Sequence, residues 1–183
     1  RQAYYLGWNE SYVEAAYRNN PVPTTGGNQW WWYTDTYRAL LQADPADTRA
    51  ALTCRTADYG TGGRRIGWTE KLMGRVDNGT RIFDSDFILY RYGEAFLMAA
   101  EARYYGKDYA GALEALAPLA ARAYGRKDYY TDTSPEAVLQ AIVDEYLREM
   151  VGEGRTWWML LRTDKIWEYL SLIHISEPTR PLY

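Results

Sequence analysis

Asp86-Phe-Ile-Leu-Tyr-Arg-Tyr-Gly-Glu-Ala-Phe-Leu-Met-Ala-Ala-Glu-Ala102 is the stretch that decides the fold class of this chain. Its apolar residues recur at steps of three and four, the spacing of one buried face of a helix. Either Ser85 or Asp86 can cap the first amides. The pattern predicts a helix from Asp86 onward with one inward stripe: Ile88 and Leu89, Tyr92, Ala95 and Phe96, Ala99 and Ala102.

A second helix is predicted after a turn at Gly106. Its inward residues are Tyr109, Ala112 with Leu113, Leu116 and Ala120. Small alanines let two helices approach closely, and the pair is typical of a tetratricopeptide-like hairpin. Pro118 removes one backbone hydrogen bond, which costs ~3 kcal/mol in a helix, so we expect a kink or break there.

Two more helices follow along the chain. Thr133-Ser-Pro-Glu136 is a helix start, with Ser134 as cap and Pro135 at the first helical position, or with Thr133 as cap. The inward residues of this third helix are Val138 with Leu139, Ile142, Tyr146 and Met150, before Gly152 and Gly154 interrupt it. The last helix carries Trp157, Trp158, Leu161, Ile166 and Trp167, and we expect one of the two adjacent indoles to pack inward.

The first half of the chain is less regular. A helix is predicted over residues 2–18, a short helical segment runs through Leu40 and Leu41, and residues 19–85 are otherwise expected to be loop-rich, with a turn at Asp77-Asn-Gly79. The predicted fold class is all-α, with tetratricopeptide-like helical hairpins and long irregular loops, in one domain over residues 1–170. Such hairpins need about three stacked units, so we expect partner helices upstream.

The C-terminal segment Ser171-Leu-Ile-His-Ile-Ser-Glu-Pro-Thr-Arg-Pro-Leu-Tyr183 is similar to a translated sequencing adapter. We expect this non-native tail to pack on nothing. It holds the only histidine, so triads with a histidine base and histidine-ligated metals are excluded from residues 1–170. The sole cysteine, Cys54, is expected to be a small buried hydrophobe. We predict no cofactor and no metal site.

Bulk composition narrows the function further. At 183 residues and 47% hydrophobic the chain can bury a real core, and its net charge of −3 argues against a nucleic-acid partner. No apolar run reaches the roughly 18 residues that a membrane-spanning helix needs. The 8 Trp and 18 Tyr against 3 Phe are unusual, and both abundant types suit wet interfaces as well as cores.

Ordered motifs along the chain resemble the SusD/RagB family. The first is Tyr90-Arg-Tyr92, Glu94, Leu97-Met98 and Ala100-Glu-Ala102; the second is Glu145, Glu149-Met150, Glu153-Gly154, Trp157, Leu160 and Arg162; and Asp47-Thr-Arg49 is similar to an earlier Asp-Pro-Arg element. The family pattern has Arg where this chain has Tyr146, Arg where it has Thr156, and Asp where it has Met159. Arg148 and Arg155 lie near these places and could restore the ion pairs.

The resemblance implies a surface-exposed outer-membrane lipoprotein that caps a SusC-like TonB-dependent transporter and binds glycans or other nutrients without chemistry. It also implies a membrane contact only through an N-terminal lipid anchor, which is missing from this chain. A carboxylate pair for glycoside hydrolysis is the competing interpretation. We favour structural ion pairs between consecutive helices for the signature residues Arg91, Glu94, Glu101, Glu145, Glu149, Glu153 and Arg162.

The run Trp30-Trp31-Trp32-Tyr33 is the strongest candidate ligand site, and Trp68 is the second. Successive side chains point about 180° apart on a strand and about 100° apart on a helix, so three adjacent indoles cannot share one core face. An exposed indole offers a flat face to a sugar, although burial under the long loop would also accommodate these side chains. The alternative function is a tetratricopeptide-like adaptor for a protein partner, and an enzyme ranks third.

Overall fold

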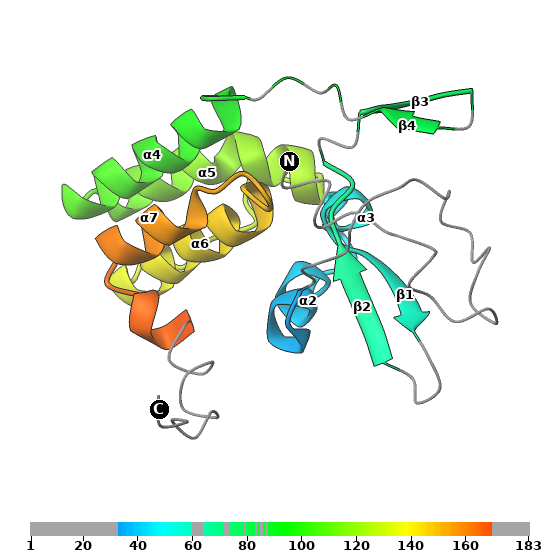
Figure 1. The fold of residues 1–183 in the computed structure, drawn as a ribbon. Coiled ribbons are helices and arrows are strands. Elements are labelled where there is room, and N and C mark those ends of the chain that lie inside the picture. The colour runs from blue at the N-terminus through cyan, green and yellow to red at the C-terminus, as the bar shows by residue number, and fades with distance from the viewer. Residues whose placement is uncertain are drawn as a thin grey trace, which may run out of the picture.

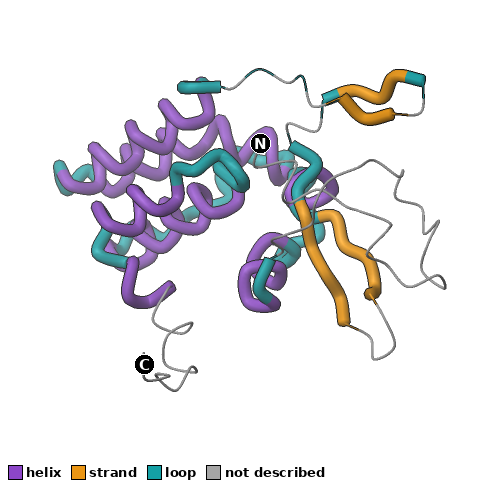
Figure 2. Tube along the Cα trace, viewed as in Figure 1, coloured by secondary structure: helices purple, strands orange, loops and turns teal. Residues whose placement is uncertain are grey.

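The computed structural model describes residues 33–59, 64–71, 74–78, 80–82, 84, 86 and 88–169. This part is mainly helical, which confirms the predicted fold class, and two small antiparallel hairpins lie beside the helices (Figures 1 and 2). The helices are α2 (Asp35–Leu41), α3 (Ala50–Thr53), α4 (Tyr92–Tyr105), α5 (Tyr109–Tyr124), α6 (Pro135–Glu149) and α7 (Thr156–Arg162). The strands are β1 (Arg55–Tyr59), β2 (Arg64–Trp68), β3 (Arg75–Asp77) and β4 (Thr80–Ile82).

The core lies among the four C-terminal helices. Helices α4 and α5 form a hairpin that packs against α6, and α7 packs beside α6 and α4 (Figure 1). The fully buried side chains come from all four helices, and include Leu97, Ala112, Leu116, Val138, Ile142, Tyr146 and Met159. A smaller cluster of Tyr33, Leu41, Cys54 and Val151 joins α2 to the turn after α6, so Cys54 is buried as predicted.

The start and the inner face of α4 differ from the prediction. The helix begins at Tyr92 rather than near Asp86, and Arg91 is its N-cap without a side-chain hydrogen bond. Most of the predicted stripe is exposed, including Ile88, Leu89 and Tyr92. The buried positions are Glu94, Leu97, Ala100 and Glu101. The carboxylates of Glu94 and Glu101 can be buried because arginines from α7 and from the turn before it neutralise them. A prediction from the spacing of apolar residues alone cannot detect such buried ion pairs.

Helix α5 follows its predicted pattern closely. Ala112, Leu116 and Ala120 are buried, and the Asp108 carboxylate accepts a 2.9 Å hydrogen bond from the Gly111 amide at the first turn. The expected break at Pro118 does not occur, since α5 continues to Tyr124. Pro118 lies on the exposed face, where water can satisfy the one carbonyl that loses its partner.

Helix α6 starts as predicted, with Ser134 as N-cap and Pro135 in the first turn, and Val138, Ile142 and Tyr146 are buried. The prediction for the last helix is wrong in two respects. Helix α7 ends at Arg162, and Ile166 and Trp167 lie beyond it, because Asp164 has the left-handed φ of 55° and interrupts the helix. Trp157 and Trp158 are 50% and 59% exposed, so neither indole packs inward. Met159 and Leu160 supply the buried face of α7 instead.

The region predicted to be loop-rich contains the two hairpins. Strands β1 and β2 pair from Arg55 opposite Trp68, and β3 and β4 pair across the predicted turn, where Asn78 has φ 48°. Polar residues dominate these short strands, so no apolar alternation indicated them. The predicted helix 2–18 and the tail 171–183 lie outside the described residues, and the predicted boundary at residue 170 stays a prediction. Within the described residues, no helix has the length and apolar character to cross a bilayer.

Replacement of Leu116 by Ala should lower the free energy of unfolding by about 2–5 kcal/mol, because the side chain is fully buried between α4 and α6. Urea unfolding measures the change. Leu161→Ala on the exposed face of α7 is the matched control and should cost less than about 1 kcal/mol. Equal losses for the two variants would contradict this description of the core.

Candidate functional site

Arg49 lies at the centre of a buried ion-pair network at the C-terminal end of α6. Its Nε donates to Asp47 Oδ1 at 2.8 Å and its Nη2 to Asp47 Oδ2 at 2.7 Å. Its Nη1 donates to Glu145 Oε2 at 2.8 Å and to Glu149 Oε2 at 3.1 Å. All four side chains are at least nine-tenths buried, so their charges interact with little screening by solvent.

The local sequence positions these groups. The Arg49 amide donates to Asp47 Oδ1 at 3.0 Å, so a tight turn holds the carboxylate against its own guanidinium. Glu145 and Glu149 are four residues apart on α6 and therefore share one face of the helix. The short Asp47-Thr-Arg49 element thus packs on the face of α6 that carries Glu145 and Glu149, which lie 96 and 100 residues after Arg49 in the sequence.

Two tyrosines complete the environment of Glu145. The hydroxyl of Tyr124 donates to Glu145 Oε1 at 2.6 Å, and that of Tyr130 donates to the same oxygen at 2.8 Å. Arg148 Nη1 in turn donates to the Tyr124 hydroxyl at 3.1 Å. Burial, reinforced by the Glu145 charge, raises the pKa of both tyrosines well above the usual range, so both hydroxyls stay protonated as donors.

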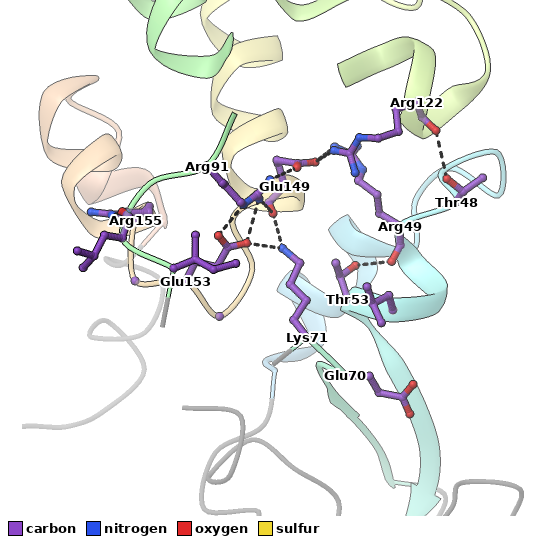
Figure 3. A pocket seen from close by; sticks show the side chains of 15 residues that line it. Thr48, Arg49, Thr53, Glu70, Lys71, Arg91, Arg122, Glu149, Glu153 and Arg155 are labelled. Atoms are coloured by element: carbon purple, nitrogen blue, oxygen red, sulfur yellow. Dashed lines mark hydrogen bonds and ion pairs between the residues drawn. The ribbon is translucent and has the colours of Figure 1, made fainter. Parts of the chain in front are cut away.

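The second half of the network faces outward (Figure 3). Arg91 Nη1 donates to Glu149 Oε1 at 2.5 Å, and Arg91 Nε donates to Glu153 Oε2 at 2.7 Å. Lys71 Nζ donates to Glu153 Oε1 at 2.7 Å and to the Glu149 carbonyl oxygen at 2.5 Å. Arg122 Nη2 donates to Glu149 Oε2 at 2.6 Å. The carboxylate of Glu149 is therefore shared by three arginines.

The electrostatic balance keeps these carboxylates ionised. Burial raises the pKa of Glu149, but the hydrogen bonds and charges of Arg91, Arg122 and Arg49 outweigh it and hold the pKa at about 2. In Glu153 burial is likewise outweighed by Arg91 and Lys71, and the pKa is lowered. A general acid for glycoside hydrolysis needs a raised pKa, so neither group suits that role.

The remaining signature residues tie α4 to α7. Arg162 Nε donates to Glu101 Oε1 at 2.7 Å, and Arg162 Nη2 donates to Glu101 Oε2 at 2.9 Å. Arg155 Nε lies 3.4 Å from Glu94 Oε1, and the Arg155 guanidinium also contacts the ring of Tyr90. Both arginines thus neutralise carboxylates on the inner face of α4.

A cleft of about 920 Å³ opens above the outward half of the network. Charged side chains from the network form one wall of the cleft, and the exposed apolar residues Leu52, Ile88 and Leu89 also line it. Gly152 and Gly154 have φ of 73° and 74°, a left-handed backbone that turns the chain sharply after α6 and directs Glu153 into the cleft. The volume is within the range of roughly 300–1,000 Å³ typical of small-molecule sites.

Of the ligand residues predicted from the sequence, the structure describes the side chain of Tyr33 alone. Trp30, Trp31 and Trp32 are outside the described residues. Tyr33 is described and is 7% exposed, and its hydroxyl donates to the Thr53 carbonyl oxygen at 2.8 Å. Thr53 lines the cleft.

Trp68, whose side chain is also outside the described part, ends β2 two residues before Glu70, which lines the cleft as well.

Lys71 and Arg122 are the site residues that the sequence did not reveal. Lys71 lies in a loop after β2, and Arg122 lies in the last turn of α5. Neither belongs to the motif residues or to a periodic pattern. A basic residue near a helix C-terminus is common because it complements the helix dipole, so the position of Arg122 alone carried no signal for this site.

Replacement of Glu149 by Gln should destabilise the fold by about 3 kcal/mol, because it leaves buried arginine charge without a partner. Glu114→Gln makes the same chemical change in an exposed ion pair with Arg103 and should cost less than about 0.5 kcal/mol. Urea unfolding at neutral pH compares the two variants. A Glu149→Gln protein as stable as Glu114→Gln would contradict the central place of this carboxylate.

Acid should destabilise the protein across a defined range. The Glu149 pKa is lowered from 4.5 to about 2, so its contribution is complete above about pH 5 and is lost as the pH falls toward 2. The shift corresponds to about 3 kcal/mol. Unfolding free energies measured between pH 5 and pH 3 should fall, with equal slopes in wild type and Glu114→Gln. A flat profile over this range would contradict the low pKa.

Comparison with known proteins agrees with the geometry. The model of the SusD family matches residues 68–173, which include α4 to α7 and the signature residues from Arg91 to Arg162. No curated protein and no solved structure gives a significant match. Because the matched part exceeds half of the 183 residues, this chain belongs to the SusD family of nutrient-binding proteins.

Proposed function

We propose that this chain is the C-terminal part of a cell-surface lipoprotein that captures an oligosaccharide or a similar nutrient without catalysis. In this proposal it delivers the nutrient to a SusC-like TonB-dependent transporter beneath it, and a lipid anchor on the N-terminal side attaches it to the outer membrane. Membership in the SusD family is the observation that carries the proposal.

The cleft supports capture at this part of the molecule. One wall of the cleft is held by ion pairs between side chains that are mostly buried, so the cleft is preorganised and little ordering entropy is lost on binding. Trp30 to Trp32 precede Tyr33, whose hydroxyl is bonded to the cleft residue Thr53. Three peptide bonds limit the Cα distance from Trp30 to Tyr33 to about 11 Å. We propose that these indoles and Trp68 contact the ligand, and we leave the buried Tyr33 out of that set.

Isothermal titration with maltohexaose, cellohexaose and xylohexaose tests saccharide capture. Trp30→Ala, Trp31→Ala, Trp32→Ala and Trp68→Ala should each be titrated beside Trp167→Ala, an exposed control indole near the end of the described chain. Loss of one stacking indole should weaken binding by about tenfold, whereas Trp167→Ala should not. Wild-type affinity in all four test variants would remove the indoles from the ligand site.

One surface favours the second candidate, an adaptor for a protein partner. Trp157, Trp158 and Leu161 share the exposed face of α7, and exposed apolar faces of this kind commonly mark protein contacts. The saccharide titrations described above distinguish the two functions. An adaptor predicts no heat of binding with any saccharide, neutral or acidic, from a correctly folded chain.

A further inference from the structure

Arg122 is the most exposed cation among the described residues that line the cleft. Arg49 also lines the cleft and pairs with Asp47, Glu145 and Glu149. Lys71, Arg91 and Arg122 share the carboxylates of Glu149 and Glu153. The other charged lining residues have partners elsewhere, since Glu70 pairs with Arg55 and Arg155 pairs with Glu94. The network is therefore balanced in formal charge, and Arg122 is the cation that it leaves most open to a ligand.

The guanidinium of Arg122 is accessible to a ligand. Its side chain is 56% exposed, whereas the Arg91 side chain is 23% exposed and the Lys71 side chain 18%. Only Nη2 of Arg122 is engaged by an ion pair in the described part of the chain, and Glu149, its partner, also receives Arg49 and Arg91. The other donors of this guanidinium can take a carboxylate without stranding Glu149.

The same cleft offers an apolar surface. Leu52, Ile88 and Leu89 are exposed and line it together with Arg122. A ligand that complements both features has a single negative charge and a non-polar face. A uronic acid unit has this chemistry, because its carboxylate projects from a ring whose C–H groups form an apolar face. A doubly charged phosphate group would exceed the single charge of this guanidinium.

We propose that the cleft binds a carboxylate-bearing saccharide, with the Arg122 guanidinium on the carboxylate and the sugar ring over Leu52, Ile88 and Leu89. The saccharide part rests on the proposed function, whereas the carboxylate part rests on Arg122 and the charges around it. Arg122 then selects acidic over neutral ligands at a position that belongs to none of the family motifs quoted above.

Titration of the full chain with galacturonate and with neutral galactose tests this selection. A charge-assisted hydrogen bond is worth about tenfold to a hundredfold in affinity, so the acidic sugar should bind tighter by this factor, and less so at high salt. Arg122→Gln should abolish the difference, and Arg122→Lys should keep part of it. Arg103→Gln, at another exposed ion pair, should leave the difference unchanged.

The outcomes distinguish this selection from saccharide capture in general. Equal affinity for galacturonate and galactose, or an acidic preference that survives in Arg122→Gln, would overturn the role of Arg122 and leave nutrient capture standing. Tighter binding of glucose 6-phosphate than of galacturonate, lost in Arg122→Gln, would overturn the carboxylate class. Failure of the folded chain to bind any saccharide would overturn the proposed function itself. Thermal unfolding of each variant verifies the fold.

Discussion

The buried carboxylate of Glu149 is the group on which the arrangement of this domain depends. Arg49, Arg91 and Arg122 reach it from three separate parts of the chain, and its own backbone carbonyl accepts from Lys71. The desolvation of one carboxylate is thus compensated by three guanidinium groups. The partners of Glu149 are as much as 100 residues away from it in sequence. Glu149 therefore fixes how the segment with the β1–β2 hairpin packs against helices α4 to α7.

The network and the apolar core have separate roles. Leu97, Leu116 and Ile142 supply non-directional burial, which holds α4, α5 and α6 together but tolerates small shifts between them. Ion pairs with paired hydrogen bonds, such as those of Arg49 with Asp47 and Arg91 with Glu153, require specific distances and angles. The ion-pair network therefore fixes the relative positions of the helices and gives the cleft a rigid wall.

The helices were predictable where the apolar pattern is strong. In α5 and α6 the buried positions follow the three- and four-residue steps, and caps such as Ser134 mark where a helix starts. In α4 the pattern failed because Glu94 and Glu101 face inward, and two apolar faces compete on the same helix. The short hairpins carry no apolar alternation, so only the turn at Asn78 was visible in the sequence.

The candidate site was predictable only in part. Motif resemblance selected Arg91, Glu145, Glu149 and Glu153 as a set, since these stand at fixed spacings in the sequence. Lys71 and Arg122 could not be selected, because a contact across 27 to 82 residues leaves no local pattern. The hydroxyls of Tyr124 and Tyr130 are likewise brought to Glu145 by the fold alone.

The C-terminal end of α6 has a further consequence for motion. Carbonyl groups at the end of a helix normally lack partners, and the last turn frays. Here Lys71 and Arg91 both donate to the Glu149 carbonyl, and the Tyr37 hydroxyl donates to that of Leu147 at 2.6 Å. Side chains from three other segments thus bind the terminal turn. We therefore expect its amides to exchange as slowly as those of the helix interior, because a local opening there has to break the contacts with α2, with Lys71 after β2 and with Arg91 before α4 together.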